Sequence, residues 1–306
     1  MTFELTILGS SSATPLINRH PSAQVLNYHE RFFLIDCGEG TQMQMLQYKV
    51  KMSKIQHILI SHLHGDHYLG LMGLLFTMHL NGRLDELHVY GQPELMDIID
   101  LQLKLSNTIL RFTLIFHPVQ HYRSVVIYDD DDFQISTIIL NHRIPCTGFL
   151  FREKMRMHKL NMDEVAKYDI PVSKLNRIKA GEDFTDADGN IIKNEKLILP
   201  PQQLRSYAYC SDTIYDEEII PYIKGVDLLY HEATFGDEMK ERAQATFHST
   251  AKQAATIARK AEVKRLMIGH FSARYKELQT LLDEAQTVFE NTELAIEGNL
   301  VQVGEC

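Results

Sequence analysis

The chain has 306 residues, 44% of them hydrophobic and 23% charged, which is the composition of a globular protein with one large or two modest hydrophobic cores. Its formal net charge of −9 argues against non-specific binding of nucleic acid by the surface as a whole. A local basic patch is still compatible with this total.

The cysteines and the apolar stretches indicate the cellular location of the protein. Cys37, Cys146, Cys210 and Cys306 are far apart and form no Cys-x-x-Cys pair, which indicates reduced thiols in a cytoplasmic protein. The most apolar stretch, 69–80, is too short to cross a bilayer and contains a histidine. We therefore expect no secretory signal, no membrane span and no membrane anchor.

Strand and helix patterns alternate along the chain. It begins with an alternating strand over 3–8 and a hairpin of 24–28 and 31–36. Further strands are expected at 55–60, 87–90, 133–140, 206–210, 226–231, 264–269 and 294–297. Helices are expected at 40–48, 68–80, 93–103, 250–261 and 275–289, with Ser249 as the N-cap of the fourth. The mixture predicts an α/β fold in which helices cover sheets.

One segment, 152–196, departs from this pattern because it is polar, charged and interrupted by proline and glycine. We interpret it as an arm inserted into a single domain that spans 1–306. Residues 186–190 lack the glycine position and closing glutamate of a calcium loop, so a hairpin turn at Asp188 and Gly189 is favoured. The acidic run 129–132 likewise predicts a solvated turn.

The first half of the arm is basic. Between Arg152 and Lys179 there are eight lysines and arginines and four acidic residues, a local charge of +4. Such a patch is suited to contacts with phosphate groups. A solvated surface insertion with incidental charge is the alternative.

Residues 61–67 read Ser-His-Leu-His-Gly-Asp-His and gather metal-seeking side chains more densely than any other stretch. His62, His64, Asp66 and His67 offer three imidazoles and a carboxylate, which borderline metals such as zinc prefer. Four ligands within six residues cannot easily surround one ion, so the spacing suggests two adjacent ions. The alternative is a solvated histidine-rich turn, which the strand pattern before the cluster and the helix pattern after it disfavour.

Three later positions place a histidine or aspartate just after an expected strand. His142, Asp212 and His270 each follow a β-like run. One histidine at the end of a strand is more often structural than functional. Three repeats of the same placement favour a shared metal site at one edge of the sheets.

The His-x-His-x-Asp-His motif with these later residues resembles the metallo-β-lactamase superfamily, and further blocks resemble its ribonuclease Z branch, which trims tRNA 3' ends. The match runs nearly end to end through blocks at 36–42, 61–67, 231–234, 248–250 and 270–275. The resemblance implies a four-layer αββα sandwich with a protruding arm. It also implies a homodimer whose substrate is precursor tRNA, with no small organic cofactor.

The resemblance also implies a two-metal centre with two Zn²⁺ per subunit, although Mn²⁺ or another divalent metal is possible. His62, His64 and His142 would bind one ion, Asp66, His67 and His270 the other, and Asp212 would bridge them. Such a pair can hold a hydroxide that attacks phosphorus and can stabilise the charge that develops there.

Three side chains are expected to act in catalysis. The resemblance makes Asp66 a proton acceptor as well as a ligand. His248 would protonate the leaving 3' oxygen, and Glu232 would orient His248 and raise its pKa. The alternative for Glu232 and His248 is a buried structural hydrogen bond.

Substrate contacts are expected from Arg19, Lys174, Arg177, Lys179 and Arg274. In bacterial relatives the arm grips the body of tRNA and bears a Gly-Pro knob, but here 170–173 reads Ile-Pro-Val-Ser. The family loop Pro-x-Lys-x-Arg-Asn appears here as 15–20, Pro-Leu-Ile-Asn-Arg-His, without its lysine and final asparagine. Recognition of the tRNA 3' end is therefore expected to differ in detail.

Other functions on the same scaffold remain as alternatives. They are a phosphodiesterase or thioesterase acting on a small molecule, a β-lactamase, a di-iron oxidoreductase, and a nucleic-acid-binding protein with an inactive site. The arm and the His-Glu-Ala-Thr block at 231–234 disfavour the small-molecule hydrolases. His64, where the di-iron branch carries glutamate, and the complete ligand set disfavour the last two.

Overall fold

The structure is a computed structural model that describes residues 2–155, 157–199 and 203–304. The chain divides into two compact units, of which the first comprises Met1–Asp129, Gln134–Arg152 and Arg205–Cys306 and the second Asp130–Phe133 and Glu153–Leu204. Cys306 lies outside the described residues. No helix of the described residues is long and apolar enough to cross a membrane.

The larger unit contains two seven-stranded sheets. The first has the order β16 (Leu300–Gln302), β1 (Phe3–Gly9), β2 (Ala23–Tyr28), β3 (Arg31–Ile35), β4 (Ile55–Leu59), β5 (Leu87–Gly91) and β6 (Leu114–Pro118). The second has the order β15 (Thr292–Leu294), β14 (Leu266–Gly269), β13 (Leu228–Glu232), β12 (Ser206–Cys210), β9 (Cys146–Glu153), β8 (Phe133–Leu140) and β7 (Val126–Asp129). Strands β3 to β6 run parallel to one another, and so do β12 to β15, whereas β3 is antiparallel to β2 and β12 is antiparallel to β9.

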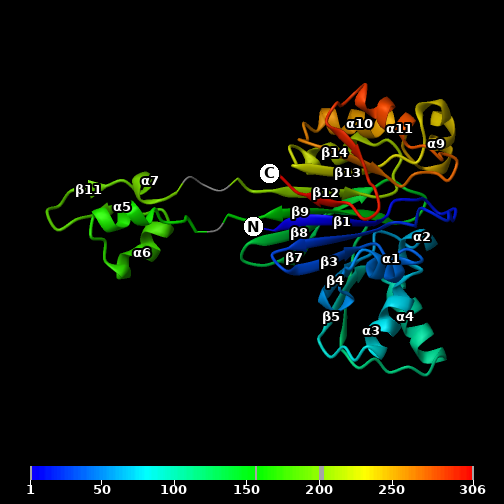
Figure 1. Cartoon of the computed structure of the whole chain (residues 1–306), viewed down its shortest axis with the longest axis horizontal. Helices are drawn as coiled ribbons and strands as arrows, with labels where there is room; N and C mark the ends of the chain where they lie inside the picture. The colour runs from blue at the N-terminus through cyan, green and yellow to red at the C-terminus, as the bar shows by residue number, and fades with distance from the viewer. Residues whose placement is uncertain (1, 156, 200–202, 305–306) are drawn as a thin grey trace. The chain divides into compact units, whose positions relative to one another are not determined.

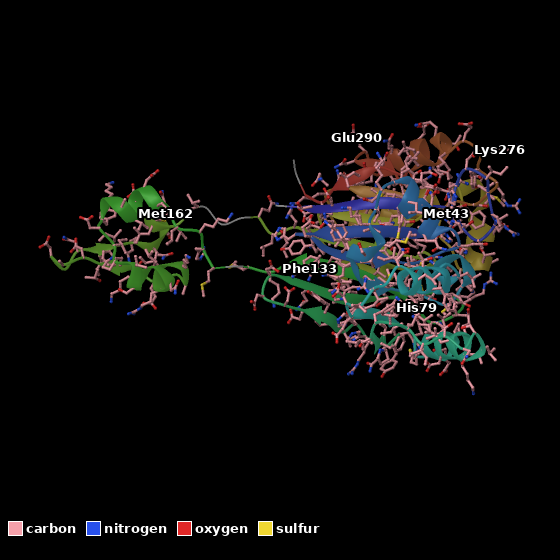
Figure 2. All side chains as sticks on the ribbon, turned by 60° about the horizontal axis from the view of Figure 1, so that its bottom comes forward. Met43, His79, Phe133, Met162, Lys276 and Glu290 are labelled. Atoms are coloured by element: carbon pink, nitrogen blue, oxygen red, sulfur yellow. The ribbon has the colours of Figure 1, made fainter. Side chains whose placement is uncertain are left out.

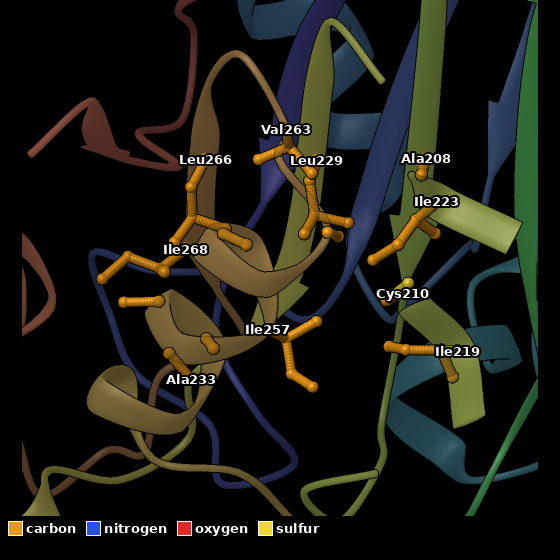
Figure 3. Close-up of a cluster of buried hydrophobic side chains, with 14 of the residues drawn as sticks. Ala208, Cys210, Ile219, Ile223, Leu229, Ala233, Ile257, Val263, Leu266 and Ile268 are labelled. Atoms are coloured by element: carbon orange, nitrogen blue, oxygen red, sulfur yellow. The ribbon is translucent and has the colours of Figure 1, made fainter. Parts of the chain in front are cut away.

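Helices cover the outer face of each sheet (Figure 1). Helices α1 (Thr41–Gln47), α3 (Leu71–Leu80) and α4 (Glu94–Leu105) share a buried cluster with the first sheet. Helices α8 (Ile220–Ile223), α10 (Ala251–Lys260) and α11 (Gln279–Gln286) do the same for the second. Figure 3 shows Ile257 of α10 beside Leu229 of β13.

Aromatic side chains fill the space between the two sheets. The rings of Phe33 on β3 and Phe151 on β9 lie 6.4 Å apart, and Phe151 stacks on Tyr207 of β12. Both faces of each sheet are therefore buried, one against helices and one against the other sheet. This confirms the predicted αββα sandwich.

Cys37, Cys146 and Cys210 are buried free thiols. Burial is the main reason why the pKa of the Cys37 thiol rises to about 12. It also raises the pKa of Cys146 and Cys210, so all three stay protonated at neutral pH.

The helix predicted at 68–80 begins at Leu71, and the larger differences from the predictions concern one further helix, one strand and one cap. The expected helix 275–289 is helical only over α11, because the backbone oxygen of Tyr275 accepts hydrogen bonds from Arg19 instead of continuing a helix. The last expected strand lies at Thr292–Leu294, where it pairs with β14. The N-cap of α10 is Thr250, whereas the hydroxyl of Ser249 donates to the backbone oxygen of Thr213. Strands β6, β7, β9 and β16 were not predicted.

Thr250→Ala is expected to lower the free energy of unfolding of the larger unit by about 1 kcal/mol. The Thr250 hydroxyl accepts the backbone N–H of Gln253 at 3.2 Å, and the Gln253 side chain accepts the Thr250 N–H at 2.9 Å, so the change removes one half of a capping box. Urea unfolding monitored by circular dichroism measures the effect. Thr250→Ser keeps the acceptor and serves as the control; an equal loss in both variants would contradict this role.

The second unit has a small core of its own. It contains α5 (Met162–Lys167), α6 (Val172–Lys179), the strand pair β10 (Phe184–Thr185) and β11 (Ile191–Ile192), and α7 (Asn194–Leu197). Its buried apolar residues are Val165, Ile170, Ile178, Phe184, Ile192 and Leu197. The hairpin turn at Asp188 and Gly189 is confirmed: Gly189 has a φ of +84°, and the Asp186 carboxylate accepts the Asp188 and Asn190 N–H groups. A turn also joins β7 and β8 across the acidic run, as predicted.

Candidate metal centre and active site

The predicted ligands come from both sheets and meet where strands end. The loop after β4 carries His62 and His64 and leads into α2 (Gly65–Tyr68), which carries Asp66 and His67. His142, Asp212 and His270 follow β8, β12 and β14. Parallel strands bring their carboxyl ends to one edge of a sheet, so these side chains converge there.

Close backbone packing holds the α2 segment in place. The Cys37 N–H donates to the backbone oxygen of His67 at 2.7 Å, and the Gly70 N–H donates to that of Cys37 at 2.9 Å. A Cβ atom on Gly38 would lie 2.5 Å from the backbone oxygen of Asp66, and one on Gly70 would lie 2.1 Å from that of Gly38. The block Asp-Cys-Gly at 36–38 therefore fixes the backbone that carries the ligands.

Four side chains form the first ligand group. His64 Nδ1 lies 3.1 Å from Nε2 of His62 and 3.1 Å from Nε2 of His142. Oδ2 of Asp212 lies 3.7 Å from His62 Nε2 and 3.8 Å from His142 Nε2. One atom from each residue therefore faces a common point, and these atoms lie within 4.8 Å of one another.

The second group uses the other oxygen of the same aspartate. Oδ1 of Asp212 lies 3.3 Å from His67 Nε2 and 3.2 Å from His270 Nε2. Asp66 Oδ2 lies 3.2 Å from His270 Nε2 and 3.5 Å from His67 Nε2. The Asp212 carboxylate thus lies between the two groups and turns one oxygen toward each.

These distances fit divalent metal ions. A tetrahedral ion with bonds of about 2.0–2.1 Å places its ligand atoms about 3.4 Å apart. Imidazole and carboxylate donors are those that zinc and similar metals take in catalytic sites. The residues present can therefore hold a divalent metal in either group.

The histidines are oriented from behind by hydrogen bonds. Nδ1 of His67 lies 2.8 Å from Asp36 Oδ2, His142 Nδ1 donates to the backbone oxygen of Phe247 at 2.9 Å, and His270 Nδ1 lies 2.9 Å from Thr234 Oγ1. Such partners fix the tautomer and leave Nε2 free to bind a metal. The Asp36 carboxylate also accepts from Ser61 N, Ser61 Oγ and Tyr209 OH, so it is fully hydrogen-bonded although buried.

The Asp212 carboxylate between the two groups is charged. Burial raises the pKa of Asp212, but the neighbouring His270, His67 and His62 outweigh burial and hold the pKa well below its usual range. Asp212 is therefore an anion between the two groups at neutral pH.

The buried Glu232 and the partly buried His248 form a pair next to the predicted ligands. Glu232 Oε1 lies 2.8 Å from His248 Nδ1 and also accepts the Thr213 N–H, while Oε2 accepts the hydroxyl of Thr234 at 2.6 Å. Burial lowers the pKa of His248, but the charge and hydrogen bond of Glu232, with Asp212 and Asp66, raise it to about 9. His248 is therefore protonated at neutral pH.

The centre opens into a cavity of about 640 Å³. Its lining includes His64, His248 and Arg274, and also Arg143 and Arg242, which the sequence analysis missed. No ion pair links any of these three arginines to an acid among the described residues. Arg143 follows a predicted ligand directly, which was a usable signal, but Arg242 reaches the pocket only through the position of α9 (Lys240–Thr246).

The other predicted contacts lie in different settings. Arg19 donates to the backbone oxygens of Ser272 and Tyr275 and lies over the Phe271 ring, so its guanidinium joins two loops. In the second unit, Arg177 pairs with Glu182. Of the described bases on the same helix, Lys174 and Lys179 form no ion pair. That these residues bind substrate stays a prediction.

Comparison with known proteins identifies relatives along the whole chain. Residues 3–159 match the family model of the Anti-Pycsar protein Apyc1, which covers the motif at 61–67 and His142 but neither Asp212 nor His270. Ribonuclease Z of Bacteroides thetaiotaomicron is 48% identical over 98% of this chain and 95% of its own length. Ribonuclease Z of Cytophaga hutchinsonii is 49% identical over 100% and 97%.

Solved structures resemble the chain over the same extent. The short form of human tRNase Z has a TM-score of 0.73 and 28% sequence identity, covering 99% of this chain and all of that one. A metallo-β-lactamase-fold protein from Bacillus subtilis has a TM-score of 0.68 at 19% identity, covering 97% of this chain and 98% of that one, and so shows the fold alone. The chain shares its first half with the Apyc1 family model, and over its full length it belongs to the ribonuclease Z family, with the metallo-β-lactamase fold.

Proposed function

We propose that this chain is a metal-dependent endoribonuclease that removes the 3' trailer from precursor tRNA, leaving a 3'-hydroxyl on the tRNA and a 5'-phosphate on the trailer. The observation that carries the proposal is the Asp212 carboxylate, which turns one oxygen to each of two ligand groups. A shared carboxylate suits two ions about 3.5–4 Å apart, the arrangement used to cleave phosphodiesters.

The proposed ions are two Zn²⁺, with Mn²⁺ or another divalent metal as an alternative. His62, His64 and His142 would hold one ion, and Asp66, His67 and His270 the other. When bound, such a pair lowers the pKa of water toward neutrality and stabilises negative charge on the phosphate. Elemental analysis of the purified protein measures the identity and number of the ions.

The chain's own groups would then move the protons. Asp66, on the side of the second ligand group, would accept the proton of the attacking water. His248, held at Nδ1 by Glu232, would donate its Nε2 proton to the leaving 3' oxygen. An alkoxide is a poor leaving group, so this proton matters for RNA.

His248→Ala is expected to slow cleavage of precursor tRNA about 10²- to 10⁴-fold. Hydrolysis of bis(p-nitrophenyl) phosphate should be nearly unchanged, because p-nitrophenolate leaves without a proton. The wild-type rate on tRNA should fall as the pH rises through about 9, where His248 loses its proton. In Glu232→Gln the lost charge lowers the pKa of His248, so this decline should begin at lower pH.

Rates of both substrates between pH 6 and 10 measure these effects. If His248→Ala lowered the rates on the two substrates equally, the histidine would act on the fold or on metal binding instead. An unmoved alkaline limb in Glu232→Gln would show that another group titrates there.

The direct test of the proposed function uses purified protein and labelled precursor tRNA, with and without chelator. A chelator-sensitive cut after the discriminator nucleotide is expected. Hydrolysis of small phosphodiesters with intact precursor tRNA would favour the alternative, a small-molecule hydrolase of the same fold.

We also propose that the enzyme is a homodimer in the cytoplasm, because the resemblance implies two subunits and the three buried cysteines are free thiols. Sedimentation equilibrium measures the number of subunits. A monomer over the working concentration range would contradict the first part.

A further inference from the structure

Glu232 is a buried carboxylate whose acceptor positions are all in use. Its Oε1 accepts the Thr213 N–H at 2.9 Å and lies 2.8 Å from His248 Nδ1. Its Oε2 accepts the backbone N–H of Thr234 at 3.1 Å and the Thr234 hydroxyl at 2.6 Å. These partners match the capacity of an ionised carboxylate, which offers about four acceptor positions and no proton. Glu232 therefore fixes the direction of every hydrogen bond that it makes.

The Thr234 hydroxyl extends this direction to a predicted metal ligand. Its one proton points to Glu232, so its oxygen can only accept from His270 Nδ1, which lies 2.9 Å away. In the neutral ring, His270 Nδ1 then carries the proton and Nε2 keeps its lone pair. This Nε2 lies 3.2 Å from Asp212 Oδ1 and 3.2 Å from Asp66 Oδ2, within the second ligand group.

The same hydroxyl also lies beside the proposed proton donor. Thr234 Oγ1 is 3.3 Å from His248 Nδ1, and the rings of His248 and His270 are stacked with centroids 5.4 Å apart. Because Thr234 is buried, solvent offers its hydroxyl few other partners. Glu232 thus directs two histidines, His248 by direct contact and His270 through one hydroxyl.

Backbone hydrogen bonds set the position of Thr234. The Ser272 N–H donates to the Thr234 backbone oxygen at 3.1 Å, and the Ala233 N–H donates to that of Gly269 at 2.8 Å. These bonds join the segment after β13 to the segment that carries His270. Valine has nearly the same shape as threonine, so Thr234→Val keeps these bonds and removes the hydroxyl alone.

We propose that Thr234 is a positioning residue that extends the action of Glu232 from the proton donor to the metal ligand His270. This rests on the proposed function, which places a divalent ion in the second ligand group. A carboxylate behind an imidazole orients the ring and makes it a stronger donor to metal. The first group has a separate support, because His142 Nδ1 donates to the backbone oxygen of Phe247.

Thr234→Val is expected to weaken the affinity of the full chain for one of two Zn²⁺ ions about 10- to 100-fold and to leave the other unchanged. Competition with a chelator of known affinity measures both ions without an activity assay. Thr234→Ser keeps the hydroxyl and should bind both ions as wild type does. Thr137→Val is the matched control, because this buried threonine accepts the Val125 N–H instead. It lies on β8, whose first residue Phe133 is labelled in Figure 2.

A double variant tests the link to Glu232. Glu232→Gln should weaken the affinity for the same ion, although Glu232 belongs to neither ligand group. Thr234→Val combined with Glu232→Gln should weaken it little further, because both changes interrupt one chain of hydrogen bonds. Excess Zn²⁺ should return Thr234→Val to within about twofold of the wild-type rate on bis(p-nitrophenyl) phosphate, by mass action. A damaged fold would not recover in this way.

Unchanged zinc affinity in Thr234→Val, an equal loss in Thr234→Ser, or additive losses in the double variant would overturn the proposal. If Thr234→Val does not fold, Glu232→Gln decides alone, since unchanged zinc affinity there would overturn it too. A wild type that binds both ions but leaves precursor tRNA intact would overturn the proposed function instead.

Discussion

Asp212→Ala is expected to lower cleavage of precursor tRNA and of bis(p-nitrophenyl) phosphate by at least about a thousandfold. Each oxygen of this carboxylate faces a different ligand group, so the change removes a donor from both. It also removes the negative charge beside His62, His67 and His270. The rates of the two reactions should fall by the same factor, because both would depend on the metals to activate the attacking water.

The measurement pairs initial rates with the metal content of the purified variant. We expect less than the full complement of metal together with retained binding of precursor tRNA, since the predicted contacts with the body of the tRNA lie on the arm. Asp100→Ala, an exposed aspartate on α4, is the control and should behave as wild type. Undiminished turnover in Asp212→Ala would refute the shared-carboxylate centre.

Removal of the second unit is expected to impair cleavage of precursor tRNA but not hydrolysis of bis(p-nitrophenyl) phosphate. Arg152 on β9 pairs with Ser206 on β12, so the two strands can be closed by a tight turn. A variant in which Asn-Gly replaces residues 154–204 should lose at least about a hundredfold in kcat/KM on precursor tRNA, because the predicted phosphate contacts are removed. Hydrolysis of bis(p-nitrophenyl) phosphate should stay within about twofold, since every predicted ligand is retained.

Substitution of two lysines tests the same role of the second unit. Lys174→Ala with Lys179→Ala should raise KM for precursor tRNA and weaken its dependence on salt, whereas Lys193→Ala, whose amine pairs with Asp183, should not. Equal losses on tRNA and the small diester in the shortened enzyme would show that the second unit serves folding.

The sequence predicted which side chains converge better than it predicted their surroundings. The motif at 61–67 could be recognised because its metal-seeking side chains are close in sequence, and the other three predicted ligands because each follows a strand. The position of Arg242 could not be predicted, since its neighbours in the cavity are distant in sequence and meet only in the folded chain. The helix expected from 275 starts late because Arg19, some 250 residues away, engages Tyr275.

The net charge of the arm shows a second limit of prediction from sequence. The count of +4 stopped at Lys179, but residues 180–196 hold five acids and two lysines, so the segment 152–196 is nearly neutral. Ion pairs such as Arg177 with Glu182 consume part of the remaining charge. A sequence window shows where basic residues occur, whereas only the fold shows which of them are left for phosphate.

Asp36 connects the packing of the two sheets with the orientation of His67, a predicted metal ligand. Asp36 directly follows β3 of one sheet, and its side chain accepts the Tyr209 hydroxyl from the other sheet and lies 2.8 Å from the imidazole Nδ1 of His67. Once the two sheets have closed over this buried side chain, the ring that faces the second ligand group is already oriented. The apoenzyme is therefore preorganised, and after chelation it should take up metal again without refolding.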